Sequence, residues 1–198
     1  MNMTPRAATL VSVLPEATPL GRAVRNTLLA LAGTAIIAIS AKIQVPFWPV
    51  PMTMQTFAII VIAMAFGAKL GFATLALYLL EGAVGLPVFA GTPEKGIGLP
   101  YMLGPTGGYL VGFVAAAWLA GWLAEKGWDR TFLKATAVNF VATAVVFVFG
   151  VAWLAPLYGL SKSIAVGVTP FLLSSAFKIA LGGALLPAAW ILVRRIRG

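Results

Sequence analysis

Long apolar segments make up most of this chain and limit what it can fold into. Hydrophobic residues account for 61% of the 198 positions and charged residues for only 10%. A soluble domain carries about 25% charged residues, so the charges here are too few to cover the surface of a soluble globule. A soluble enzyme and a disordered chain are both excluded, and the apolar segments must face lipid or one another.

Six of these segments are candidates for membrane-spanning helices. A helix needs about 20 mainly apolar residues to cross the hydrocarbon core of a bilayer. The six segments cover residues 24–43, 53–66, 70–84, 108–123, 132–154 and 170–193. The sequence therefore predicts an all-α fold, a polytopic membrane protein that forms a bundle of six transmembrane helices.

The basic residues predict the orientation of this bundle, because cytoplasmic loops of membrane proteins are enriched in Lys and Arg. With six spans and both termini in the cytoplasm, most basic residues lie on the cytoplasmic side: Arg6, Arg22, Arg25, Lys69, Lys126, Arg130, Lys134, Arg194, Arg195 and Arg197. The outer side carries Lys42, Lys95 and Lys162. Topology thus explains the net charge of +9, and we expect no nucleic-acid partner.

The first 21 residues are expected to form a short cytoplasmic tail. Pro5, Pro15 and Pro19 interrupt any helix there. The stretch also lacks the compact apolar core and the small-residue cleavage site of a signal peptide. Residues 22–198 show no strong internal repeat and no domain boundary, so we expect them to form a single transmembrane domain.

The inventory of reactive side chains is small. The chain has no Cys and no His, which excludes thiolate and imidazole chemistry. The acidic residues are scattered and form no close pair in one apolar segment: Glu16, Glu81, Glu94, Glu125 and Asp129. Ser, Lys and Tyr remain, but no pattern among them indicates an active site. We therefore expect no metal or cofactor, and a role in binding or passage rather than catalysis.

The connections after the first and the third segment differ from ordinary solvated loops. They are long, uncharged over most of their length and rich in Pro, Gly and aromatic residues. Irregular backbone near a membrane is tolerated where it packs on protein or lines a cavity, which predicts a lid over the outer end of the bundle. Alternatively, Phe47, Trp48, Phe89 and Tyr101 belong to the aromatic belt at the membrane interface.

One cation, Lys178, lies in the middle of the sixth apolar segment. A lysine at that depth costs at least about 2.5–3.5 kcal/mol on insertion scales, so it requires a partner. Lys178 could anchor an anionic ligand group, with the hydroxyls of Ser174 and Ser175 one helical turn away. It could equally form an internal ion pair with Glu81, and the sequence leaves both alternatives open.

Three further polar side chains lie within apolar segments. Gln55 begins the second segment beneath the Pro-rich connection, and Asn139 and Thr143 lie one turn apart in the fifth. Each could line a cavity or make an interhelical hydrogen bond.

Small residues recur every four positions in the first segment, at Ala30, Thr34 and Ala38. Residues of this size at this spacing let helices approach closely. The series fits either packing inside the bundle or contact with a partner subunit.

Three strings near the outer connections give a more specific indication. They are VPMTMQTF at 50–57, EGAVGLPVFAG at 81–91 and GPTGGY at 104–109. With these strings in this order and a six-segment layout, the chain resembles the BioY family over residues 24–193. BioY proteins are the biotin-specific substrate-binding (S) components of energy-coupling-factor (ECF) transporters.

The resemblance implies high-affinity binding and uptake of biotin across the cytoplasmic membrane of a prokaryote. It implies as partners a membrane coupling subunit and two cytoplasmic ATPases, which would hydrolyse ATP because this chain has no Gly-rich phosphate loop. The series Ala30, Thr34 and Ala38 would contact the coupling subunit. Assembly as a homo-oligomer is left open.

The resemblance also implies a pocket closed by the first and third outer connections. The expected ligand-binding residues are Lys178, Ser175, Glu81, Gln55, Asn139, Phe47, Phe89, Gly91 and Tyr109. Family members commonly carry an acid three residues before the lysine, where this chain has Ser175. That difference leaves open an S component for another small vitamin-like ligand. A further alternative is a non-transporting accessory subunit, whose polar residues only hold the helices together.

Overall fold

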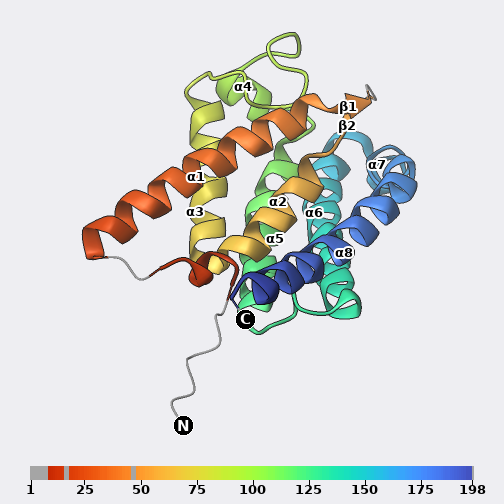
Figure 1. Cartoon of the computed structure of the whole chain (residues 1–198). Helices are drawn as coiled ribbons and strands as arrows, with labels where there is room; N and C mark the ends of the chain where they lie inside the picture. Colours follow the sequence, from red (N-terminus) through yellow and green to blue (C-terminus); the bar gives the residue numbers. More distant parts are fainter. Residues whose placement is uncertain (1–8, 16–17, 46–47, 198) are drawn as a thin grey trace.

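The computed structural model describes residues 9–15, 18–45 and 48–197, so the predicted ligand contact Phe47 lies outside the described residues. The described chain is a bundle of helices (Figure 1). The helices are α1 (Pro19–Lys42), α2 (Gln55–Phe66), α3 (Ala68–Ala83), α4 (Gly98–Met102), α5 (Gly107–Glu125), α6 (Phe132–Tyr158), α7 (Leu160–Gly167) and α8 (Leu172–Arg197). Short strands β1 (Gln44–Val45) and β2 (Met52–Thr53) and the 3₁₀ turns Val11–Val13 and Thr169–Phe171 complete the fold.

Helix α5 lies at the centre of the bundle. It packs against α6, α2 and α3, while α1 packs on α2 and α3, and α8 packs on α6 and α2. The contact faces of α5 carry small residues, and Ala116, Ala117, Ala120 and Ala124 are fully buried. A Cβ atom at Gly121 would collide with the backbone at the start of α3. Small side chains thus bring the helices close enough to pack directly on one another.

Large apolar side chains cover the outside of the bundle. Leu133, Phe140, Val148 and Phe177 are between 62% and 78% exposed. In the part of the chain that the structure describes, four helical stretches are long and apolar enough to cross a membrane. They are Pro19–Lys42, Gly107–Glu125, Phe132–Tyr158 and the stretch Leu160–Ile196. An apolar exterior on helices of this length is that of a membrane protein, as the composition predicted.

The second and third predicted segments form shorter helices than the others. Helix α2 has 12 residues and α3 has 16. At 1.5 Å per residue they are about 18 and 24 Å long, which is less than the hydrocarbon core of about 30 Å. Gly67, with φ of 85°, joins the two helices; a residue without a Cβ adopts this conformation without strain. The count of six spans therefore remains a prediction.

Helix α1 begins at Pro19, earlier than the segment expected from 24 onward. Thr18 caps the helix by accepting a hydrogen bond from the Gly21 N–H at 3.1 Å. Proline is favoured at the first helical position, where its missing N–H would have no partner in the helix. Pro19 therefore starts a helix, whereas it was expected to interrupt one.

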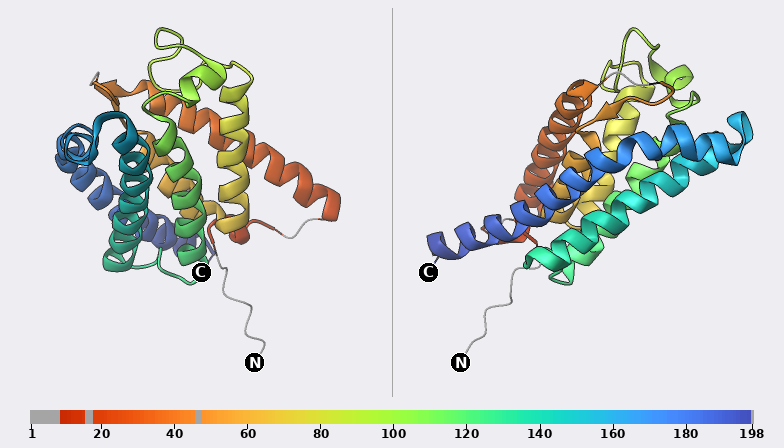
Figure 2. Two further views of the ribbon diagram at one scale, coloured as in Figure 1. Left: turned by 180° about the vertical axis from the view of Figure 1, so that it is seen from behind. Right: turned by 90° about the vertical axis from the view of Figure 1, so that its right-hand side faces the viewer.

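Both connections that are expected on the outer side, here called the outer connections, are folded. In the first, β1 pairs with β2 in antiparallel register, with Gln44 opposite Thr53 and Val45 opposite Met52, so the all-α prediction missed a small hairpin. The second connection contains α4. The hairpin and α4 lie at the same end of the bundle, away from the end of α8 (Figure 2).

Candidate functional site

A cavity of about 50 Å³ lies beneath the two outer connections. Both connections and the helices α5, α6 and α8 contribute to its wall. The lining residues are Val50, Pro51, Thr53, Gln55, Thr56, Phe89, Ala90, Tyr101, Thr106, Tyr109, Leu110, Phe113, Thr143, Val146, Phe147, Phe171, Ser175 and Lys178. An apolar and aromatic wall with a few polar groups is typical of small-molecule sites.

Lys178 is the cation of this wall. It is half-buried, and its Nζ atom donates a hydrogen bond of 3.1 Å to the backbone oxygen of Thr53 in β2. Lys178 and Thr53 also border a groove of about 610 Å³ on the outer face of α8, next to the exposed side chain of Phe177. Their contact thus lies between the cavity and this groove.

Ser175 lies three positions before Lys178 on the same face of α8 and lines the same cavity. It is 6% exposed. The hydroxyl of its neighbour Ser174 donates to the Phe171 carbonyl at 3.0 Å, and Ser174 borders the outer groove. Of the two serines considered with Lys178, only Ser175 therefore lines the cavity.

Glu81 lies away from the cavity. Its Oε1 atom accepts a hydrogen bond of 3.0 Å from the Thr34 hydroxyl, between α3 and α1. Among the described residues, the one salt bridge is that between Arg130 and Asp129. The structure thus provides no support for an internal ion pair of Lys178 with Glu81, nor for Glu81 in the cavity wall.

Gln55 joins the cavity wall to the lid through a short chain of hydrogen bonds. Its Nε2 atom donates to the hydroxyl of Tyr78 in α3 at 2.7 Å, and Tyr78 donates in turn to the Val88 carbonyl at 2.9 Å. Both Gln55 and Tyr78 are buried. Unpaired buried polar groups are costly, so these two bonds fix the amide that faces the cavity.

Phe89 places an aromatic ring from the second connection directly into the cavity wall. It is 1% exposed, stacks on Tyr101 at 5.1 Å between ring centroids and meets Tyr78 edge-on at 5.4 Å. The ring also lies so close to Gly82 that a Cβ atom there would collide with it. The burial of both rings supports the prediction that the connections form a lid. It does not support the alternative that Phe89 and Tyr101 belong to the aromatic belt at the membrane interface. Trp48, in contrast, is 64% exposed.

Four backbone carbonyls of the second connection are held by the side chains of two tyrosines and a lysine. Besides the bond from Tyr78 to Val88, the Tyr101 hydroxyl donates to Ala90 at 2.7 Å. Burial raises the pKa of Tyr101 above its ordinary value of 10.0, so this hydroxyl keeps its proton at neutral pH and remains a donor.

The lysine is Lys42, at the last position of α1. Its Nζ atom donates to the Phe89 carbonyl at 2.9 Å, the Thr92 carbonyl at 2.8 Å and the Thr92 hydroxyl at 3.0 Å. From the sequence, Lys42 was expected only as a charge on the outer side. Its position at the end of an apolar segment was the available signal, and nothing in the sequence linked it to the second connection.

Of the expected ligand contacts Tyr109 and Gly91, only Tyr109 lies in the cavity wall. Tyr109 lines the cavity and donates to the Gly167 carbonyl at 2.8 Å, which ties α5 to the end of α7. Gly91 does not line the cavity. Its φ of 71° favours glycine, so it shapes the turn that follows Phe89.

Asn139 lies outside the cavity wall. Its amide donates to the Ala135 carbonyl at 2.9 Å and contacts the Met64 sulfur at 3.7 Å. It is 1% exposed and packs against Gly182 of α8. The structure thus supports an interhelical role for Asn139, whereas Thr143, one turn later, does line the cavity.

The small-residue series of α1 packs largely inside the bundle. Ala30 and Thr34 are buried, and Ala38 is half-buried. The Thr34 hydroxyl bonds to Glu81 of α3, and a Cβ atom at Gly33 would lie 2.7 Å from the methyl group of Thr74. These contacts support internal packing of the series and do not show a surface for a partner.

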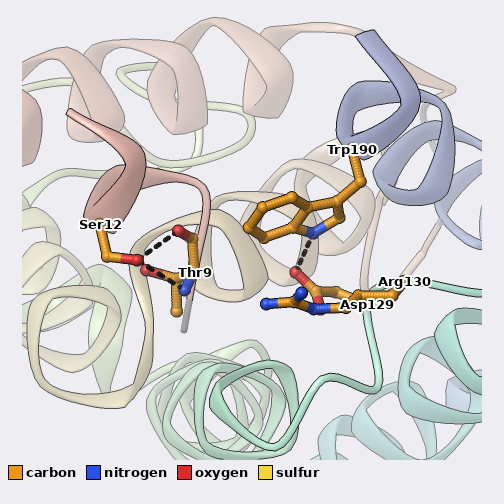
Figure 3. A network of polar contacts seen from close by, with 5 residues as sticks. All are labelled: Thr9, Ser12, Asp129, Arg130 and Trp190. Atoms are coloured by element: carbon orange, nitrogen blue, oxygen red, sulfur yellow. Dashed lines mark hydrogen bonds and ion pairs between the residues drawn. The ribbon is translucent and has the colours of Figure 1, made fainter. Parts of the chain in front are cut away.

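A second polar cluster, drawn in Figure 3, lies at the turn between α5 and α6, at the other end of the bundle from the hairpin and α4 (Figure 1). The indole of Trp190 in α8 donates to the carboxylate of Asp129 at 2.5 Å, and the Arg130 guanidinium lies over the Trp190 ring at 4.3 Å. Asp129 is fully buried, and this burial raises its pKa above 3.8. These contacts hold α8 against the turn between α5 and α6.

Comparison with known proteins identifies relatives along almost the whole chain. The sequence profile of the BioY family matches residues 7–195. The probable biotin transporter BioY of Pyrococcus horikoshii is 34% identical over 164 residues, which are 83% of this chain and 91% of that protein. The biotin transporter BioY of Thermotoga maritima is 38% identical over 149 residues, 75% of this chain and 85% of that protein.

One solved structure is similar in fold. It is described as the S-component for biotin from an ECF-type ABC transporter. The TM-score is 0.71, and the alignment covers 91% of this chain and 95% of that chain at 24% sequence identity. At this level of identity the match shows a shared fold, that of a helical membrane bundle.

Proposed function

Because this chain belongs to the BioY family, we propose that it binds biotin and serves as the substrate-specific (S) component of an ECF-type transporter. The binding site is the cavity beneath the two outer connections. The relatives named as biotin transporters support this ligand over another vitamin-like molecule.

One observation carries the proposal. Lys178, Ser175 and Gln55 come from two helices that are far apart in the sequence, yet all three line one cavity under the lid. A lysine placed inside an apolar helix is costly unless it has a function or a partner. Here its ammonium bonds to a backbone carbonyl, which a ligand oxygen can replace.

The chemistry of the cavity wall matches that of biotin. The carboxylate and the ureido carbonyl of biotin both carry oxygens that accept a hydrogen bond from an ammonium such as that of Lys178. Its ureido N–H groups require acceptors, which the Ser175 hydroxyl and the Gln55 amide can supply. Its apolar ring and chain fit against Phe89, Tyr109 and the aliphatic wall.

The lid has to move when the ligand enters. Pockets for small molecules usually measure about 300–1,000 Å³, whereas this cavity measures about 50 Å³. Phe89 and the Thr53 carbonyl both lie in the wall and belong to the two outer connections. Outward displacement of these connections enlarges the cavity and opens it to the outside.

The topology follows from the same family assignment. We propose six spans, with α2 and α3 as the short ones, in the cytoplasmic membrane with the lid outside. The basic residues Lys69, Lys126, Lys134 and Arg194 lie at the ends of helices that are then cytoplasmic.

The partners would be a membrane coupling subunit and two ATPase subunits. The ATPase subunits would hydrolyse ATP, so this chain itself is no enzyme. Copurification of two differently tagged copies of the chain would detect a homo-oligomer.

Uptake in cells tests the proposal. A biotin auxotroph without its own biotin transporter would express this chain, alone or with an ECF module, and accumulation of labelled biotin would be measured. We expect accumulation with the wild-type chain and none with Lys178→Met at equal membrane levels. Accumulation that is the same for both would contradict the proposed site. Affinity purification from the same cells would show whether coupling and ATPase subunits accompany the chain.

A further inference from the structure

The outer end of α1 is connected to both parts of the lid. Lys42 ends the helix and holds two residues of the second connection, Phe89 and Thr92, through three hydrogen bonds of 2.8–3.0 Å. Two residues further along, Gln44 pairs with Thr53 in the hairpin of the first connection. Thr53 is the residue whose carbonyl accepts the bond from Lys178.

Lys42 binds the backbone carbonyl of Phe89, the residue whose ring closes the cavity. Thr92 is buried and donates its hydroxyl hydrogen to the same Phe89 carbonyl that Lys42 binds, at 2.6 Å. The Lys42 ammonium thus bridges the two ends of the turn from Phe89 to Thr92, and the Phe89 ring projects from that turn into the cavity wall.

Lys42 differs from the other side chains that hold this connection. Tyr78 and Tyr101 make neutral hydrogen bonds to Val88 and Ala90, whereas a bond from an ammonium is about twice as strong as a neutral one. Tyr101 also lines the cavity, and Lys42 does not. Lys42 therefore acts on the ligand only through the position of the lid.

We propose that Lys42 is a positioning residue that clamps the lid shut and thereby sets how slowly a bound ligand leaves the cavity. The clamp has to break for the turn from Phe89 to Thr92 to move outward. Because Lys42 belongs to α1, a shift of the outer end of α1 loosens the second connection and the hairpin together. This inference rests on the proposed function for the identity of the ligand but not for the existence of the clamp.

The first measurement needs no ligand. The chain has no cysteine, so a single Ser175→Cys substitution provides a thiol in the cavity wall, and its rate of labelling by a small thiol reagent in detergent reports lid opening. We expect Lys42→Met to raise this rate about tenfold, the scale of one lost charge-assisted hydrogen bond. Lys42→Arg keeps the cation but not the compact three-donor geometry, and it should give an intermediate rate.

The matched control is Lys95→Met. Lys95 lies exposed in the same connection, and this variant should leave the labelling rate unchanged. If Lys42→Met does not fold, Thr92→Val decides the question, because it keeps the size of the side chain but removes one acceptor of Lys42. An unchanged labelling rate in the folded Lys42 variant, or in Thr92→Val where that variant is needed, would overturn the clamp.

The second measurement follows release of labelled biotin from the chain with its native Ser175. Lys42→Met should release biotin about ten times faster than the wild type, with a smaller change in the association rate, and Lys42→Arg should restore part of the difference. If the wild type binds biotin and both variants release it at the wild-type rate, the clamp is wrong. If the wild type binds no biotin while Lys42→Met still accelerates labelling, the proposed function fails and the clamp stands.

Discussion

The ammonium of Lys178 lies 3.1 Å from the backbone oxygen of Thr53 and donates a hydrogen bond to it. This bond joins the last helix to the hairpin that follows the first helix, across most of the chain. It also defines what the ligand has to displace, because both residues line the cavity. The cost of a cation inside an apolar helix is thus offset in part by a carbonyl of the lid.

Replacing Lys178 by methionine should abolish or greatly weaken biotin binding while leaving the protein folded. Methionine has a similar length and no charge, so it removes the ammonium and also the cost of burying it. Binding of labelled biotin and the melting temperature in detergent would be measured together. Lys162→Met, at an exposed lysine of α7, is the control that should bind as the wild type does. Full binding by Lys178→Met would contradict the assignment.

Replacing Ser175 by aspartate should strengthen biotin binding. The carboxylate would lie one turn from Lys178 on the same helix face, where the ammonium compensates its charge, and it would accept hydrogen bonds from the N–H groups of biotin. A charged acceptor contributes more than a neutral one, so we expect a gain of about tenfold. Ser175→Asn, of the same shape without the charge, should not give this gain. Weaker binding by Ser175→Asp than by Ser175→Asn would show that no ligand N–H group points toward this position.

The contact of Gly82 with Phe89 predicts a loss of both stability and affinity in Gly82→Ala. The added methyl group would collide with the Phe89 ring, and overpacking of this kind costs about 1–3 kcal/mol. Thermal unfolding and biotin affinity would be compared for Gly82→Ala, Phe89→Leu and the double variant. The smaller leucine leaves room for the methyl group, so the double variant should lose less than the sum of the single changes. Strict additivity would argue against this contact.

The buried carboxyl of Asp129 makes stability depend on pH. Its pKa in the folded protein is raised above 3.8 because burial disfavours the charged form. The folded state therefore binds the proton more tightly than the unfolded state. The resulting stabilisation is present below the unfolded pKa and is lost as the pH rises through the folded pKa.

Asp129→Asn removes this titration and keeps an acceptor for the indole of Trp190. It should be at least as stable as the wild type at pH 7, and its advantage should shrink as the pH falls toward 4. Asp129→Ala leaves the Trp190 N–H without its partner and should be less stable by about 1–3 kcal/mol. Melting temperatures in detergent from pH 4 to 8 check both expectations. A stability difference between Asp129→Asn and the wild type that does not change with pH would contradict the raised pKa.

The membrane character of the fold could be predicted from the sequence because it depends on composition and segment length alone. The helices α5, α6 and α8 lie close to the expected segments. The β1–β2 hairpin could not be predicted, since two paired residues leave no alternating pattern. Pro19 was misread because a proline both stops a helix and starts one, and only the cap at Thr18 distinguishes the two.

The candidate site could be predicted only in part. Lys178 and Ser175 stand out because polar side chains in an apolar helix are costly, and both line the cavity. Glu81 and Asn139 stand out by the same criterion, yet they bond to Thr34 and Ala135 away from it. The free-energy cost of burying a polar side chain shows that the residue needs a partner. Only the packing of the helices decides which partner it has.

Equilibrium binding of labelled biotin to the purified chain tests the central claim most directly. We predict saturable binding to one site at nanomolar concentrations, displaced by unlabelled biotin and lost in Lys178→Met. The absence of saturable binding, or displacement by another vitamin at lower concentrations than by biotin, would contradict it.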